Sequence, residues 1–273
     1  MPEDLIEWLT KGRKALDLAR KGVNQWLDAP EGRVPKGLFV VGCQRSGTTM
    51  LIDTLMKAPQ LWSHPEKSNI AYDNYRLRTP SVVDLVIRST PADTVVFKPL
   101  CDSHLADKIL DAHADSRAIW MVRSWPDVAS SAVKKWGSHQ ADVVRAIADG
   151  RADEVGWRGE RIPAQLIAQL REVVTPEMSD IAGAALFWYV RNSFYFMLGL
   201  DQDPRVRLVR YEDLVTRPGE VFPALFAHIG ASYDPAWIED IQDRSTPTAR
   251  PDGVSDDIAA LCDALQARLK MTN

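Results

Sequence analysis

The chain has 273 residues, of which 45% are hydrophobic and 26% are charged, and its formal net charge is −4. This length and composition predict one large α/β domain with a core of its own. The slight acidity excludes binding to DNA or to anionic membranes through overall charge, so an anionic ligand would have to be held by local arginines.

Segments typical of helices and strands alternate along most of the chain. Residues 3–28 have the apolar spacing of a helix. Short apolar runs predict strands at 38–42, 94–98, 117–123 and 205–210, and a weaker run lies at 61–64. The same reading predicts helices at 48–58, 81–89, 102–114, 126–136, 181–200 and 219–229.

The predicted strands are continuous apolar runs, which favours a mainly parallel sheet with helices on both faces. We therefore expect a three-layer α/β/α fold in which residues 1–273 form a single domain. Residues 134–180 contain no strand-like run and carry several charges. They are expected to form a helical insertion or lid in that domain.

No segment predicts a membrane span or a disulfide framework. The most apolar late segment, 186–200, is too short to cross a bilayer and carries Arg191. Cys43, Cys101 and Cys262 are odd in number and widely spaced, which is typical of reduced thiols in a cytosol. The charged N-terminus lacks the apolar core of a signal peptide, so we expect a cytoplasmic protein.

Residues 42–49, G-C-Q-R-S-G-T-T, follow the first strand with the spacing of a P-loop, G-x-x-x-x-G-K-[ST]. Backbone N–H groups at such a turn bind phosphate with little help from side chains. Thr48 stands where the lysine should be, so γ-phosphoryl transfer would lose one of its main electrostatic supports. The loop therefore predicts an anion site other than a kinase or GTPase site, with Arg45 as the replacement cation.

A second motif spans the strand predicted at 117–123 and the helix after it. Arg123 ends this strand, and Ser131 follows eight residues later on a helix opened by Pro126 and Asp127. Side chains so placed can converge on one ligand in the crevice at the carboxyl ends of parallel strands. By itself the motif also fits an ordinary strand end followed by a helix.

Together the two motifs resemble those of the sulfotransferases that use 3′-phosphoadenosine-5′-phosphosulfate (PAPS), and they are closest in style to bacterial and tyrosylprotein members. The family loop P-[KR]-S-G-T-T and the family segment R-x-x-x-D-V-x-x-S both have counterparts here, and L-V-R-Y-E-D-L at 208–214 is a third match. The resemblance implies PAPS as donor and PAP as product. It implies that the 5′-phosphosulfate is bound by Arg45, Ser46, Gly47, Thr48 and Thr49. It also places the 3′-phosphate at Arg123 and Ser131, and the adenine near Tyr211.

The sequence departs from the family pattern in three places. Gln44 replaces the usual proline of the loop, and Trp125-Pro126 shifts the proline of the second motif by one position. The R-K-G segment that many members carry near the C-terminus is absent, and Arg244 and Arg250 are the candidates to supply its charge.

In-line sulfuryl transfer needs a base on the acceptor hydroxyl and stabilisation of charge on the bridging oxygen. The resemblance implies that Glu66 is the base, with His64 and His104 as the alternatives. Sulfuryl transfer carries less negative charge than phosphoryl transfer from donors such as ATP, so we expect a metal to be dispensable. Lys98, which ends the strand predicted at 94–98, faces the same crevice as the P-loop. The resemblance implies that Lys98 points to the bridging oxygen, and we expect Arg45, the replacement cation of the loop, to stabilise the departing oxygen with it.

Other functions are compatible with parts of the sequence. A small-molecule or nucleotide kinase with a degenerate loop and a catalytically inactive nucleotide-binding protein of the same fold both stay open. Asp102-Ser103-His104 does not predict a catalytic triad, and His104 and His113 lack zinc-type spacing.

The acceptor pocket is expected to come from residues 65–90 and 134–180. Aromatic side chains that could line it are Trp62, Tyr72, Tyr75, Trp136 and Trp157. These segments show no dense basic run, which favours a small or lipid-like hydroxyl compound and no nucleic-acid partner. The oligomeric state is open.

Overall fold

The computed structural model describes residues 20–25, 33–242 and 249–272. Residues 20–25 are helical, and the rest of the helix predicted at 3–28 lies outside the described residues.

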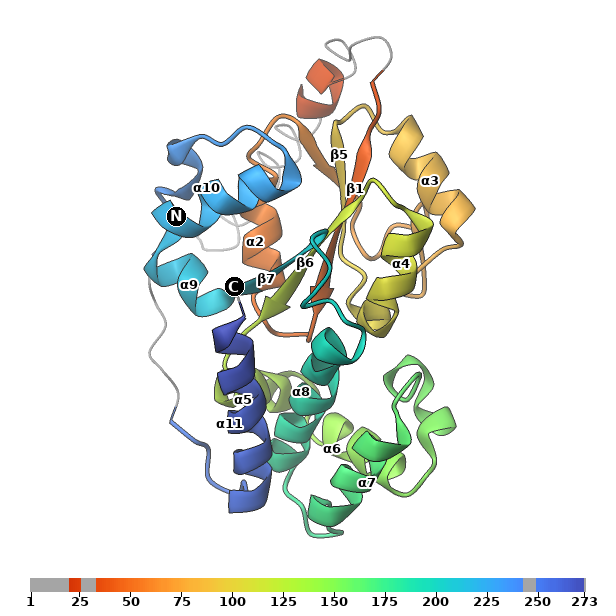
Figure 1. The fold of residues 1–273 in the computed structure, drawn as a ribbon, viewed down its shortest axis with the longest axis vertical. Helices are drawn as coiled ribbons and strands as arrows, with labels where there is room; N and C mark the ends of the chain where they lie inside the picture. The colour runs from red at the N-terminus through yellow and green to blue at the C-terminus, as the bar shows by residue number, and fades with distance from the viewer. Residues whose placement is uncertain (1–19, 26–32, 243–248, 273) are drawn as a thin grey trace, which may run out of the picture.

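A five-stranded sheet stands at the centre of the fold (Figure 1), with the order β2-β5-β1-β6-β7. Its strands, all paired in parallel, are β1 (Lys36–Gly42), β2 (Leu61–Ser63), β5 (Thr94–Phe97), β6 (Arg117–Val122) and β7 (Val206–Arg210). Every predicted strand is therefore present.

The alternation of side chains along β1 divides the core into two halves. Leu38 and Val40 point to one face, which is covered by α2 (Thr48–Leu55), α9 (Tyr211–Thr216) and α10 (Pro218–Ile229). Phe39 and Val41 point to the other face, which packs against α3 (Pro80–Ser89), α4 (Ala106–Ala112), α5 (Trp125–Trp136) and α8 (Asp180–Met197). Because a parallel strand buried on both faces needs apolar residues at every position, this arrangement explains the uninterrupted apolar runs. It confirms the predicted three-layer fold.

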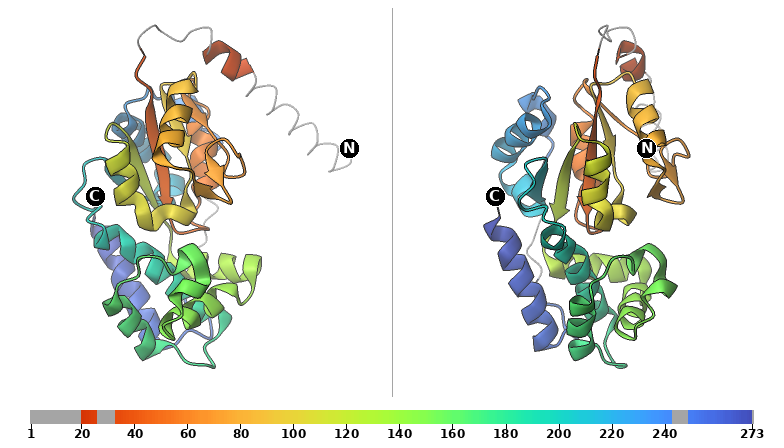
Figure 2. Two further views of the ribbon diagram at one scale, coloured as in Figure 1. Left: turned by 90° about the vertical axis from the view of Figure 1, so that its right-hand side faces the viewer. Right: turned by 45° about the vertical axis from the view of Figure 1, so that its right-hand side comes forward.

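A group of helices lies at the carboxyl ends of the strands, below the sheet in Figures 1 and 2. It contains α5 and α8 together with α6 (His139–Ala148), η2 (Ala152–Arg158), α7 (Ala164–Val173) and α11 (Asp256–Met271). Residues 134–180 belong to this group, and the site is built where it meets the sheet. The part of the chain that the structure describes contains no helix with the length and apolarity that crossing a membrane requires.

Some elements differ from the prediction. The helix predicted at 102–114 is divided into η1 (Leu100–Leu105) and α4. A small hairpin of β3 (Tyr72–Asp73) and β4 (Arg76–Leu77) was not predicted, because two-residue strands are too short to show a pattern. Its turn is made by Asn74 and Tyr75, both with positive φ. The helices α9 and α11 and the short η3 (Pro235–Ile238) are further additions.

Candidate functional site

The P-loop connects β1 to α2 and depends on two glycines. Gly42 has φ 127°, and a Cβ there would lie 2.3 Å from the carbonyl oxygen of Met121 on the neighbouring strand β6. Gly47, which caps α2, has φ 86°, and its Cβ would lie 2.2 Å from the ring of Tyr211. A side chain at either position would therefore force the loop away from its neighbours.

The start of α2 has the features of an anion site. No side chain caps this helix in the described structure, and its first turn contains no acidic residue. The first N–H groups of a helix lack partners within the helix and attract negative charge. Ser46 is fully buried, and its Oγ has no hydrogen-bond partner among the described residues. Buried hydroxyl groups are seldom left unpaired, so these donors are suited to receive an anion from outside the chain.

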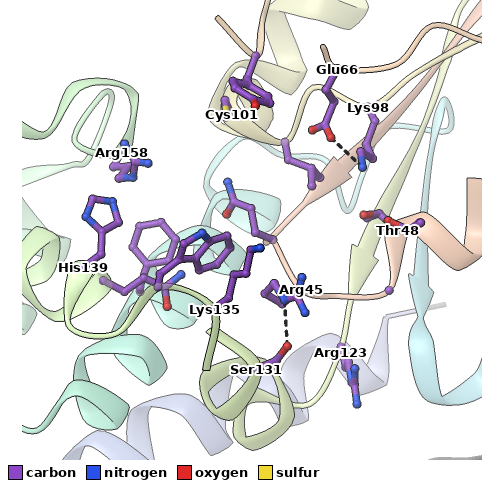
Figure 3. Close-up of a pocket in the computed structure, with 18 of the residues that line it drawn as sticks. Arg45, Thr48, Glu66, Lys98, Cys101, Arg123, Ser131, Lys135, His139 and Arg158 are labelled. Carbon is purple, nitrogen blue, oxygen red and sulfur yellow. Dashed lines mark hydrogen bonds and ion pairs between the residues drawn. The ribbon is translucent and has the colours of Figure 1, made fainter. Parts of the chain in front are cut away.

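The second motif lies beside the loop (Figure 3). The Arg123 guanidinium lies 4.5 Å from the centre of the Tyr211 ring and 3.6 Å from Asp127. The Nε–H of Arg45, an exposed side chain in the loop, donates to Ser131 Oγ at 2.9 Å. Tyr211 therefore contacts Gly47 as well as Arg123, and the two motifs form one continuous surface.

The predicted base and the predicted cation form an ion pair at the ends of two paired strands. Lys98 Nζ lies 2.7 Å from Glu66 Oε2, and each side chain is 20% exposed. The backbone N–H of Lys98 donates to the buried Tyr72 Oη at 2.7 Å. Burial raises the pKa of Tyr72 well above its ordinary value, so this phenol stays neutral. Glu66 and Lys98 are thus held at the edge of the sheet where the P-loop also lies.

One cavity of about 810 Å³ joins these groups. Every site residue predicted from the sequence lines it, with the exception of Ser46: Arg45, Gly47, Thr48, Thr49, Glu66, Lys98, Arg123, Ser131 and Tyr211. Of the aromatic candidates, Tyr75, Trp136 and Trp157 line the cavity, whereas Trp62 and Tyr72 do not.

The two histidines considered as alternative bases lie away from the lining. His64 Nε2 is 3.1 Å from Thr90 Oγ1, whose own proton goes to the Val86 carbonyl, so His64 is the donor in this contact. His104 is fully buried with Nε2 2.8 Å from Glu160, and burial lowers its pKa to about 4. Neither contributes to the cavity as the structure describes it.

The C-terminal arginines were candidates for the charge of the missing R-K-G segment. Arg250 Nη1 pairs with Asp256 at 2.7 Å, and Arg250 does not line the cavity. Arg244 lies outside the described residues.

Several lining residues were not identified from the sequence. They include the basic or titratable side chains Lys67, Lys135, His139 and Arg158, and also Cys101 and Phe187. They come from separate elements and match no motif. The only signal in the sequence was position: Lys67, Lys135, His139 and Arg158 lie within the two segments expected to form the acceptor pocket, whereas Cys101 and Phe187 lie outside them.

Comparison with known proteins identifies the family. Residues 35–248 match the family model of the sulfotransferase domain. The sulfotransferase domain from the curacin biosynthetic pathway is 18% identical, with a TM-score of 0.50, and the match covers 89% of this chain and 93% of that chain. A sulfotransferase from Mycobacterium avium is 15% identical, with a TM-score of 0.52, and the match covers 89% of this chain and 78% of that chain. No match was found among curated protein sequences.

At these identities the two structures establish a common fold, whereas the family model spans most of the chain. The fold, the lysine-free loop and the family match agree. The chain belongs to the sulfotransferase family, whose reaction is the transfer of a sulfuryl group.

Proposed function

We propose that the protein transfers a sulfuryl group from PAPS to the hydroxyl of an acceptor, by in-line displacement and without a metal. The observation that carries this proposal is the arrangement of one cavity. It is lined by a P-loop without lysine, by Arg123 and Ser131, and by the Glu66–Lys98 ion pair. These are the groups that the reaction needs on the donor and on the acceptor.

The donor fits the residues at hand. The uncapped N–H groups at the start of α2, the unpaired Ser46 Oγ and the hydroxyls of Thr48 and Thr49 suit a 5′-phosphosulfate. Arg123 and Ser131 are assigned to the 3′-phosphate. Arg45 donates to Ser131 rather than to the Glu66–Lys98 pair, so we assign its charge to the phosphates and that of Lys98 to the bridging oxygen.

Glu66 and Lys98 divide the chemistry of the transfer step. Glu66 accepts the proton of the acceptor hydroxyl while the acceptor oxygen forms its bond to sulfur. The bond between sulfur and the bridging oxygen breaks, and PAP leaves with the electron pair. When Glu66 takes up the proton, Lys98 loses its anionic partner, and its ammonium group is then available to the negative charge on the departing oxygen.

Two alternatives are less well supported. A kinase would lack the P-loop lysine, whose position is held by Thr48. An inactive nucleotide-binding protein would not need the Glu66–Lys98 ion pair on the cavity wall.

The proposal also includes a single domain, with residues 134–180 as a lid over the acceptor. A cytoplasmic location is part of it as well and is supported by three free cysteines.

A calorimetric titration with PAP in the presence of EDTA tests the donor site. We expect binding with a dissociation constant in the micromolar range or below, and much weaker binding of ATP, which lacks a 3′-phosphate. Arg123→Ala should weaken PAP binding by about tenfold or more, because it removes a charge-assisted contact. Failure of the unchanged protein to bind PAP, or a preference for ATP that depends on magnesium, contradicts the proposal.

A further inference from the structure

Arg158 is a cation without an anionic partner on the wall of the cavity. It is the last residue of η2 and is half-buried, and no carboxylate of the described chain pairs with it. Its guanidinium instead lies 4.4 Å from the centre of the Trp157 ring, and burial lowers its pKa. In Figure 3, Arg158 and His139 lie on the side of the cavity opposite Glu66 and Lys98.

The neighbours of Arg158 in the chain hold this segment in place. Glu160 accepts two hydrogen bonds from Arg76 at 2.6 and 2.8 Å and lies 2.8 Å from His104 Nε2. Arg161 pairs with Asp107 at 2.6 and 2.8 Å. Arg158 is therefore the one member of this charged group, Arg158, Glu160 and Arg161, that the described structure leaves unpaired. Its position is fixed by the other two.

Basic side chains outnumber acidic ones in the lining of the cavity, although the whole chain has a net charge of −4. Lys67 and Lys135 also line the cavity without an ion-pair partner in the described ranges. The only acidic side chain in the lining that the structure describes is Glu66, and Lys98 already neutralises it. Arg45 and Arg123 are used in the proposed donor site, and Lys135 follows Ser131 by one turn of α5 and lies beside Arg45 in Figure 3. Lys67 is next to Glu66 in the chain, so Arg158 is the cation that we assign to the far end of the acceptor.

A second guanidinium packs against Trp157. Arg191 is fully buried, and no carboxylate in the described part of the chain pairs with it. Its guanidinium lies 4.9 Å from the centre of the Trp157 ring, which therefore contacts two arginines. Arg191 Nη2 donates to the Leu100 carbonyl at 3.4 Å and Arg191 does not line the cavity, so Arg158 is the arginine of this pair that can meet a bound anion.

We propose that the natural acceptor is an anionic hydroxyl compound. Its carboxylate, sulfonate or phosphate group binds Arg158, and its hydroxyl reaches Glu66. Aromatic side chains in the lining of the same cavity provide apolar surface for the body of the molecule, namely Tyr75, Trp136, Trp157 and Phe187. This inference rests on the proposed sulfuryl transfer and narrows the acceptor class expected from the sequence, which showed no basic run.

Matched pairs of small acceptors test this inference by calorimetry on the PAP-saturated protein. The first set shares a phenol: 4-hydroxybenzoate, 4-hydroxybenzenesulfonate and 4-hydroxyphenyl phosphate are compared with neutral 4-hydroxybenzamide. The second set shares an alkyl chain: 12-hydroxydodecanoate is compared with its amide. We expect an anionic member to bind about tenfold more tightly than its neutral counterpart. The ranking of the three phenols identifies the anionic group.

Variants then assign the preference to Arg158. Arg158→Met keeps the aliphatic volume against Trp157 and should remove the preference while leaving the affinity for the neutral compound unchanged. Arg158→Lys should retain part of it. Arg151→Ala is the matched control, because Arg151 precedes the same helix η2 but is exposed, pairs with Asp149 and Glu154, and does not line the cavity.

Several results overturn the inference. The first is equal affinity for the anionic and the neutral compound of a set, and the second is no binding of any anionic compound. The third is an equal loss of affinity for the anionic and the neutral compound in Arg158→Met. Weaker PAP binding in Arg158→Met would also overturn it, because Arg158 would then serve the donor. Loss of PAP binding in the unchanged protein is a different outcome and contradicts the proposed function itself.

Discussion

Glu66 and Lys98 are 32 residues apart in the sequence and 2.7 Å apart in the structure. Their strands explain the proximity: β2 and β5 pair in parallel with Ser63 opposite Val96, so the chain leaves both strands at the same edge of the sheet. Each residue follows its strand by only a few positions. The ion pair is thus a product of strand register.

Replacement of either member of this pair should separate catalysis from donor binding. We expect Glu66→Gln and Lys98→Ala each to lower kcat by about 10²- to 10⁴-fold, because one removes the proton acceptor and the other the stabilising charge. The dissociation constant of PAP should be unchanged in Glu66→Gln. The double variant should lose less than the product of the two single effects, because the residues act together.

Lys57→Ala provides the control for this pair, since Lys57 forms an exposed ion pair with Asp240 away from the cavity. Its kcat should equal that of the unchanged protein. Turnover at the normal rate in Glu66→Gln would refute the assignment of the base and return His64 to consideration.

Gly47→Ala should damage the donor site through sterics. The added Cβ would lie 2.2 Å from the Tyr211 ring at a φ of 86°, so the loop and Tyr211 must separate. We expect PAP affinity to fall at least about tenfold and the free energy of unfolding to fall by about 1–3 kcal/mol. Gly47→Ala/Tyr211→Ala should recover only part of the lost stability, because it removes the collision but keeps an alanine at positive φ. Gly219→Ala, where no atom lies within 4 Å of the new Cβ, should behave as the unchanged protein.

Tyr72→Phe should loosen Lys98 without touching the cavity. The substitution removes the acceptor of the Lys98 N–H and leaves that group unpaired, at a cost of about 1–3 kcal/mol. We expect lower stability in denaturant and a reduced kcat with unchanged PAP affinity. Tyr189→Phe breaks a tyrosine hydrogen bond to Gln169 outside the cavity and should leave kcat unaltered. A normal kcat in Tyr72→Phe would show that Lys98 is positioned by other contacts.

Acid should destabilise the protein through His104. Burial lowers the pKa of His104 from 6.5 to about 4, so below pH 6.5 the unfolded chain takes up a proton that the folded protein does not. Stability therefore falls as the pH drops from 6.5 to 4, by up to about 3 kcal/mol from this group. Hydrogen bonds from Arg76 lower the pKa of Glu160 to about 2, which adds a further loss below pH 4.5.

Denaturant unfolding at a series of pH values measures this loss. His104→Gln keeps a donor for Glu160 but cannot titrate. The free energy of unfolding of this variant should therefore depend less on pH between pH 6.5 and 4. A slope identical to that of the unchanged protein would refute the role of His104.

The sheet and the donor half of the site could be predicted because their information is local. Apolar runs identify buried strands, and the loop at 42–49 and the Arg123–Ser131 spacing are short patterns with a physical reason. The carboxyl ends of parallel strands share an edge, which was sufficient to expect Lys98 near the P-loop.

The acceptor half could not be predicted in the same way. Lys67, Lys135 and Arg158 lie on different parts of the chain, and only the packing of the helices beside the sheet brings them to the lining of one cavity. The absence of a basic run in the sequence says nothing about such scattered cations, because they are brought together only by the fold. The sequence around Arg158 also gave no reason to place it in the site. Its position depends on the ion pairs that Glu160 and Arg161 form with residues far away in the chain.

The short helix η1 has a consequence for engineering. Ser103 Oγ, in η1, lies 2.9 Å from both the N and the O of Gly42, and Asp102 beside it lies 2.7 Å from Arg76, which holds Glu160. A chain of polar contacts thus runs from the start of the P-loop to the segment that presents Arg158. Exchanging residues 152–158 while keeping Arg76, Asp102 and Glu160 should retarget the enzyme to acceptors of different charge without rebuilding its use of the donor.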